Sequence, residues 1–157
     1  ERAFSAEWPR NNANLTRLKH ILNTVQQDGS RLIDIPGFAS RVALLETDLQ
    51  ALRWLSLRAL HEKADGRSNL PIGSLLTIRG SELLQKIGDL QIEALGSYAN
   101  YVYLDPQGSP EIENSWVSGP DYAPGIMADY LYRRATTVYG GANEVQRTII
   151  ARSFLEM

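Results

Sequence analysis

A tyrosine followed by two glycines is the stretch of this sequence whose residue types could hold a ligand. Residues 139–144 read Tyr-Gly-Gly-Ala-Asn-Glu. Glycines let the backbone pass close to a ligand, because they have no side chain and tolerate positive φ. The helix expected after them would present unpaired N–H groups and its positive dipole end to a phosphate or another anion. On local grounds alone, the run is more typical of a plain Gly-rich turn between helices with Asn143 as the cap.

Metal and nucleophile chemistry find little support elsewhere in the chain. The sequence has no cysteine and only two histidines, which excludes zinc fingers, disulfide scaffolds and cysteine nucleophiles. His20 and His61 stand beside charged residues, which indicates solvated side chains. The carboxylates do not form the inward-facing Glu-x-x-His pairs of a carboxylate-bridged metal site. We therefore predict no bound metal.

The length and composition suit one domain that covers residues 1–157. The periodicity described in the next paragraph predicts that this domain is all-α. The chain has 43% hydrophobic residues, and 16 cations against 18 anions give a net charge of −2. This near-neutral balance argues against nucleic-acid binding, which needs a concentrated basic face. No apolar run approaches the ~20 residues of a membrane span. The absence of targeting segments and cysteines favours a cytoplasmic location.

Helical periodicity accounts for most of the chain, because apolar residues recur at spacings of three and four. The expected helices cover residues 11–27, 38 to about 59, 72–99, 126–137 and 143–155. Asn11 or Asn12 is the expected cap of the first helix. The Asp28-Gly29 pair ends it, and Pro36 suits the first position of the next. With no segment of strand period, we predict an up-down helical bundle of four to five helices.

The expected third helix and the loop after it indicate a packed or functional surface. Its inward face is predicted to carry Leu76, Leu83, Ile87, Leu90 and Ala94. Four glycines, Gly73, Gly80, Gly88 and Gly96, interrupt it at about 1 kcal/mol each relative to alanine, so we expect a neighbour or ligand to pack closely there. Residues 105–124 are rich in proline and glycine and lack a period. A structureless stretch of about 20 residues is usually functional or covers an interface.

Extended to residue 152, the glycine run resembles the C-terminal signature of the acyl-CoA dehydrogenases. The match reads Tyr-Gly-Gly-Ala-Asn-Glu-Val-Gln-Arg-Thr-Ile-Ile-Ala-Arg, with Arg134 five residues before the tyrosine. Residues 80–85 and 91–96 resemble the family's penultimate long helix. The whole chain is most similar to the branch that includes pimeloyl-CoA dehydrogenase-like large subunits. The resemblance implies the C-terminal helical domain of a three-domain flavoenzyme.

The resemblance also implies a reaction. The family oxidises a fatty acyl-CoA to the trans-2-enoyl-CoA: a carboxylate takes the α-proton and the β-hydride passes to N5 of FAD. The carboxylate must be shielded from water, with its pKa raised toward the working pH. Tyr139 and Gly140 would line the thioester end of the acyl-CoA pocket.

The catalytic base does not stand at the sequence position where the family most often carries it. The residue after the motif tyrosine, often the catalytic glutamate of the family, is Gly140 here. Some members carry the base in a Glu-Arg pair on the first helix of this domain, and Glu1 with Arg2 matches that pair. Glu1 is therefore the predicted base. Glu144 is a weaker candidate, because it lies in the segment that resembles the flavin contact.

FAD contacts are assigned by the resemblance to two places. Ala142, Asn143 and Glu144 would lie against the cofactor, with Ala142 in place of the usual threonine. Gln91 and Gly96 would match the Gln-x-x-Gly-Gly region, on which a neighbouring subunit's adenosine rests. The nearby arginines, Arg134, Arg147 and Arg152, are expected to form ion pairs rather than to act in catalysis.

The resemblance further implies self-association into a dimer or tetramer, with an identical or a paralogous subunit, and electron-transfer flavoprotein as the acceptor. Residues 1–157 alone are expected to be inactive. One alternative is a helical oligomerisation module with a decayed site. Two features are consistent with this alternative: Gly140 has no carboxylate, and the family's Arg-x-x-Phe-Gly stretch has no counterpart between Arg17 and Phe38. The other is a relative with the same fold and the chemistry of an acyl-CoA oxidase or nitroalkane oxidase.

Overall fold

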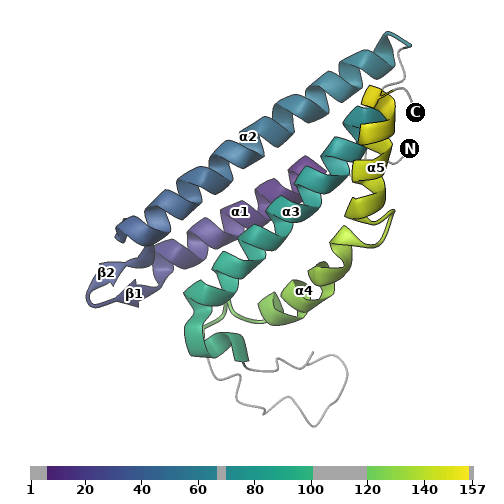
Figure 1. The fold of residues 1–157 in the computed structure, drawn as a ribbon. Helices are drawn as coiled ribbons and strands as arrows, with labels where there is room; N and C mark the ends of the chain where they lie inside the picture. The colour runs from purple at the N-terminus through teal and green to yellow at the C-terminus, as the bar shows by residue number, and fades with distance from the viewer. Residues whose placement is uncertain (1–6, 67–69, 101–119, 156–157) are drawn as a thin grey trace.

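The chain folds as an up-down bundle of α-helices around one central helix (Figure 1). The computed structural model describes residues 7–66, 70–100 and 120–155. Within those ranges the α-helices are α1 (Glu7–Thr24), α2 (Pro36–Ala64), α3 (Leu70–Leu95), α4 (Ile126–Arg133) and α5 (Asn143–Leu155). Helix α3 contacts each of the other four, and α2 and α5 lie on opposite sides of it. The predicted all-α bundle is confirmed.

The core forms where the predicted apolar faces of the first three helices meet. On α3 all five residues predicted to face inward are buried. The second helix buries Val42, Leu45, Leu49 and Leu52. On α1, Leu18 and Leu22 have no exposed surface. Complete burial of a leucine side chain stabilises a fold by about 1.5–3 kcal/mol, so these faces dominate the stability of the bundle.

Helix α1 differs from the prediction at both ends. It begins at Glu7 rather than at residue 11, and it ends at Thr24 rather than at residue 27. The predicted asparagine cap is wrong, because Asn11 lies inside the helix and is completely buried. Its Nδ2 donates a hydrogen bond to the Gly80 carbonyl of α3 at 3.1 Å. Sequence alone did not distinguish an asparagine that caps its own helix from one that bonds a partner helix.

A short hairpin separates α1 from α2, where the sequence predicted no strand. Its strands are β1 (Gln26–Gln27) and β2 (Ser30–Arg31), which pair antiparallel. Asp28 and Gly29 form the turn with φ of 51° and 78°, and positive φ at both positions is typical of a type I′ hairpin. Strands of two residues are too short to show an alternating pattern. Pro36 is the first residue of α2, as predicted.

The glycines of α3 have different roles. A Cβ at Gly88 would lie 3.3 Å from the Tyr130 ring, so the predicted close packing is confirmed there. At Gly96 no described atom comes within 4 Å of the Cβ position, so no part of the described chain packs closely there. Gly96 instead adopts a φ of +56°, which ends α3. The 3-10 helix η3 (Gly96–Asn100) replaces the last turn of the predicted helix.

The chain returns to the bundle through residues 120–125, while the rest of the predicted irregular loop lies outside the described residues. Arg17 of α1 donates hydrogen bonds to the carbonyls of Tyr122 at 3.3 Å and Pro124 at 3.1 Å. After α4, the 3-10 helix η6 (Arg134–Thr137) completes the helical segment predicted for 126–137. In the parts of the chain that the structure describes, no helix has both the length and the apolar character needed to cross a bilayer.

Candidate functional site

The predicted ligand-binding run forms the Gly-Gly turn (residues 139–142), which joins η6 to α5. Gly140 has a φ of 80° and Gly141 a φ of 111°, in a region of backbone conformation that favours glycine. Gly140 is exposed, and no described atom lies within 4 Å of the position a Cβ would take. The backbone at Gly140 is therefore open to a group that lies against it.

The first residue of α5, Asn143, is held by α3. Only 4% of its surface is exposed. Its Nδ2 donates to Oγ of Ser81 at 3.3 Å, and its Oδ1 lies 3.4 Å from the same oxygen. The side chain of Asn143, a residue predicted to lie against FAD, thus points into the bundle. A contact between Asn143 and a ligand would use the backbone.

Two further polar residues are buried where α5 packs against α3, and the sequence analysis did not predict their burial. They are Ser81 on α3 and Gln146 on α5, with exposed fractions of 3% and 8%. Gln146 stands three and four residues before Ile149 and Ile150, both half-buried, so helical spacing places it on the inward side of α5. This spacing could have predicted that Gln146 faces inward. It does not indicate which group the side chain bonds.

Ion pairs surround the junction at its surface. Arg147 contacts Glu82 of α3 at 2.7 Å, and Arg134 contacts Asp89 at 2.7 Å. The Arg134 guanidinium also lies 4.2 Å from the ring centroid of Tyr130. The predicted ion-pair role of these two arginines is confirmed. Such exposed pairs contribute about 0–1 kcal/mol each, so they add little to the stability of the bundle.

Tyr139 and Glu144 stand on either side of the glycines and are both exposed. The Tyr139 ring lies 6.3 Å from that of Tyr132, at an angle of 38°. The Glu144 side chain is 81% exposed and lies 3.9 Å from Arg147. A base for α-proton abstraction has to be shielded from water, and in this structure Glu144 has no such shield.

Other predicted site residues lie apart from the turn. Gln91 is buried, and its Nε2 donates to the Asn14 carbonyl of α1 at 3.1 Å. It follows Ser81 by ten residues on the same helix, a rise of about 15 Å, and Gly96 lies further along the chain. The structure therefore does not bring Gln91 or Gly96 to the Gly-Gly turn. Glu1 lies outside the described residues.

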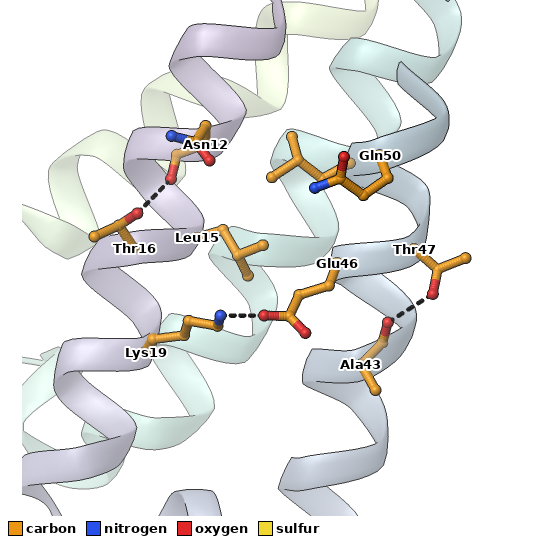
Figure 2. Close-up of a pocket in the computed structure, with 9 residues that line it drawn as sticks. Asn12, Leu15, Thr16, Lys19, Ala43, Glu46, Thr47 and Gln50 are labelled. Carbon is orange, nitrogen blue, oxygen red and sulfur yellow. Dashed lines mark hydrogen bonds and ion pairs between the residues drawn. The ribbon is translucent and has the colours of Figure 1, made fainter. Parts of the chain in front are cut away.

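A groove between α1 and α2 is the second notable region (Figure 2). It has a volume of about 550 Å³ and is lined by Asn12, Leu15, Thr16, Lys19, Ala43, Glu46, Thr47, Leu49 and Gln50. The ion pair between Lys19 and Glu46 crosses it. Thr16 and Thr47 each donate their hydroxyl to a carbonyl of their own helix at 2.9 Å. None of the predicted site residues lines this groove.

The described residues also show no cluster of three or more His, Asp or Glu side chains that could hold a metal ion.

Comparison with known proteins identifies the bundle. The family described as "Acyl-CoA dehydrogenase, C-terminal domain" matches residues 10–155. This chain belongs to that family. The family resemblance found in the sequence is thereby confirmed, while the pimeloyl-CoA dehydrogenase branch stays a prediction. No match was found among curated protein sequences.

Solved structures of larger enzymes contain a similar bundle. Butyryl-CoA dehydrogenase from Megasphaera elsdenii has a TM-score of 0.73 and 16% identity over 95% of this chain and 34% of that chain. A glutaryl-coenzyme A dehydrogenase in complex with glutaryl-CoA has a TM-score of 0.75 and 17% identity over 98% and 34%. The FAD complex of PigA has a TM-score of 0.71 and 17% identity over 94% and 33%. This chain spans about a third of each, and at such identities the likeness shows the fold alone.

Proposed function

We propose that this chain is the C-terminal helical domain of a three-domain, FAD-dependent acyl-CoA dehydrogenase of the pimeloyl-CoA dehydrogenase-like branch. The enzyme would remove the α-proton and β-hydride of an acyl-CoA thioester to give the trans-2-enoyl-CoA. One observation carries the proposal. A chain of this family holds two glycines at positive φ, with exposed backbone, directly before the N-terminus of α5.

The turn fits an extended anionic cofactor such as FAD. Gly140 leaves its backbone uncovered, and the first amides of α5 lie at the positive end of the helix dipole. Ala142 and Glu144 flank Asn143, whose own side chain is bonded to α3. We assign the FAD contact to Ala142, Glu144 and the backbone of Asn143. When bound, FAD accepts the hydride, and the residues of this chain bind and orient it.

The substrate and base assignments complete the proposal. Tyr139 and Gly140 contact the thioester end of the acyl-CoA, and Glu1 takes the α-proton. Because the Glu144 side chain is 81% exposed, it is the weaker candidate for the base. Glycine at 140 has no carboxylate, so the base must be supplied by another segment.

Self-association into a dimer or tetramer, with an identical or paralogous subunit, is the second part of the proposal. Helix α2 exposes large apolar side chains at Trp54, Leu57 and Leu60, with 67%, 45% and 45% of their surfaces accessible. Clustered apolar exposure marks interaction surfaces in proteins. Gly96, which is exposed directly after α3, would lie near a neighbouring subunit's adenosine. Gln91, which bonds the Asn14 carbonyl, would stabilise the helix beside that contact. We also propose a cytoplasmic location and electron-transfer flavoprotein as the acceptor.

The test uses the full-length protein, purified with its cofactor and kept free of oxygen. We expect a flavin absorption band that is bleached by one member of a series of saturated acyl-CoAs. Glu1→Gln should abolish bleaching with flavin content unchanged, and the matched variant Glu46→Gln, in the groove between α1 and α2, should keep it. Bleaching that survives in Glu1→Gln but is lost in Glu144→Gln with flavin still bound would move the base to Glu144.

The alternatives predict other outcomes of the same experiment. A flavin that no acyl-CoA bleaches would overturn the dehydrogenase assignment, and absence of flavin would favour a helical oligomerisation module. Repeated turnover with oxygen as the acceptor, with one hydrogen peroxide formed for each substrate oxidised, would favour the oxidase relative. Residues 1–157 alone should form no enoyl-CoA, because the other two domains of the proposed three-domain enzyme would be missing, and turnover by them would contradict this expectation.

A further inference from the structure

Gln146 folds back over the start of α5 and covers the Gly-Gly turn. Its Nε2 donates a long hydrogen bond of 3.4 Å to the Gly141 carbonyl, and only 8% of its surface is exposed. A Cβ at Gly141 would lie 2.5 Å from the same nitrogen. Gly141 therefore leaves the space that the amide of Gln146 occupies.

A polar side chain buried in this place has to be bonded, because an unpaired amide in a bundle interior costs about 1–3 kcal/mol. The backbone of Gln146 is also engaged, since its N–H donates to the Ala142 carbonyl at 3.0 Å. One residue thus contacts the turn at two successive carbonyls, those of Gly141 and Ala142. Asn143, bonded to Ser81, fixes the adjacent residue to α3.

Two successive glycines need such a support. Glycine populates positive and negative φ about equally, so a Gly-Gly pair by itself selects no conformation. At Gly140 no described atom lies within 4 Å of the Cβ position. No described packing contact on that side therefore favours its φ of 80° over other values. At its start the turn is held by the Tyr139 N–H, which donates to the Ala135 carbonyl at 3.0 Å. At the glycines themselves the described side-chain contact comes from Gln146, on the side of Gly141.

We propose that Gln146 is a positioning residue: its side chain holds Gly140 and Gly141 in the conformation that presents the backbone of residues 139–142 to the ligand. The identity of that ligand as flavin and thioester rests on the proposed function, whereas the ordering of the turn does not. Gln146 acts through the turn and touches neither substrate nor cofactor.

The first measurement is NMR relaxation of the 157-residue chain. Gln146→Met keeps the size of the side chain but removes the donor, and Gln146→Glu keeps size and polarity but has no donor when ionised. We expect backbone order parameters at Gly140 and Gly141 to fall from about 0.85 to below about 0.6 in both variants. Leu83 and Ile87 in the core of α3 should be unchanged. Gln50→Met, on the exposed side of α2, is the matched control and should change none of these values.

The second measurement is steady-state turnover of the full-length protein that carries the same variants. We expect kcat to fall by about tenfold or more, with flavin content and KM for the acyl-CoA within twofold of wild type. A residue that only stabilises the bundle would instead lower flavin content and order throughout.

Glycines that stay ordered in both variants would overturn the inference, and so would a uniform loss of order across α3. If Gln146→Met fails to fold, Gln146→Glu decides. Absence of flavin or of acyl-CoA turnover in the wild-type protein would overturn the proposed function and leave the NMR result to decide the role of Gln146.

Discussion

The groove between α1 and α2 and the junction between α3 and α5 differ in what they offer a ligand. The groove has a volume of about 550 Å³, but its threonine hydroxyls bond their own helices and its central charges pair with each other. The junction combines buried Ser81, Asn143 and Gln146 with glycines at positive φ. The proposed site therefore does not coincide with the empty volume of the groove. It is distinguished by buried polar pairs beside a turn of two glycines, and a buried polar group is costly unless it is bonded.

The largest expected effect comes from filling the space at Gly141. Gly141→Ala should destabilise the domain by about 2–3 kcal/mol, because alanine at a φ of +111° is strained and its Cβ displaces the Gln146 amide. Urea unfolding followed by circular dichroism measures the change. Gly37→Ala is the control: it lies in the first turn of α2 with no described atom within 4 Å of its Cβ position, and it should stabilise by about 0.4–1 kcal/mol. Equal effects at the two glycines would remove the distinction between the junction and an ordinary helical surface.

A smaller effect is expected at the pair between α3 and α5. Asn143→Ala should cost about 1–2 kcal/mol, because it leaves Ser81 buried with one partner fewer. Adding Ser81→Ala to that variant should cost less than Ser81→Ala costs in the wild type, with a coupling energy of about 1 kcal/mol in the double-mutant cycle. Additive costs would mean that the two side chains are neighbours without a bond that matters.

The smallest effect is expected in the groove. Lys19→Met and Glu46→Gln should each change the free energy of unfolding by less than about 0.5 kcal/mol, since both side chains are more than 40% exposed and exposed ion pairs contribute little. The difference should shrink further in 0.5 M salt, where charges are screened. A loss of 2 kcal/mol or more in either variant would place the groove on a par with the junction and contradict the comparison.

The parts of the fold that follow from local pattern were predicted well. Spacings of three and four predicted the bounds of α5 and the buried faces of α2 and α3. Proline chemistry indicated Pro36 as the first residue of α2, two residues before the start of its periodic pattern. The errors occur where the backbone changes direction over two or three residues. The hairpin after α1 and the end of α3 at Gly96 depend on individual φ values that periodicity does not encode.

The candidate site was predicted only in part, and for a related reason. The glycines of the turn and the family to which they point are local in sequence. The direction of the Asn143 side chain is set by Ser81, which is 62 residues away, and that of Gln91 by Asn14, which is 77 residues away. Both had been predicted to contact cofactor. In the structure both side chains bond another helix, and the predicted cofactor contacts of the two residues stay predictions.

The sequence by itself determined the helices, their apolar faces and the family, because each is written in residues that are close together along the chain. Only the tertiary structure decided which polar side chains turn inward. A buried asparagine or glutamine is stable wherever a partner is within hydrogen-bonding distance, and the partner is supplied by a different helix or by a turn. Asn11 on Gly80, Asn143 on Ser81 and Gln146 on Gly141 are three such choices. Packing the helices against α3 brings the first two pairs together, and no spacing in the sequence records them. Gln146 and Gly141 are only five residues apart, and the φ values of the turn bring them within reach of each other.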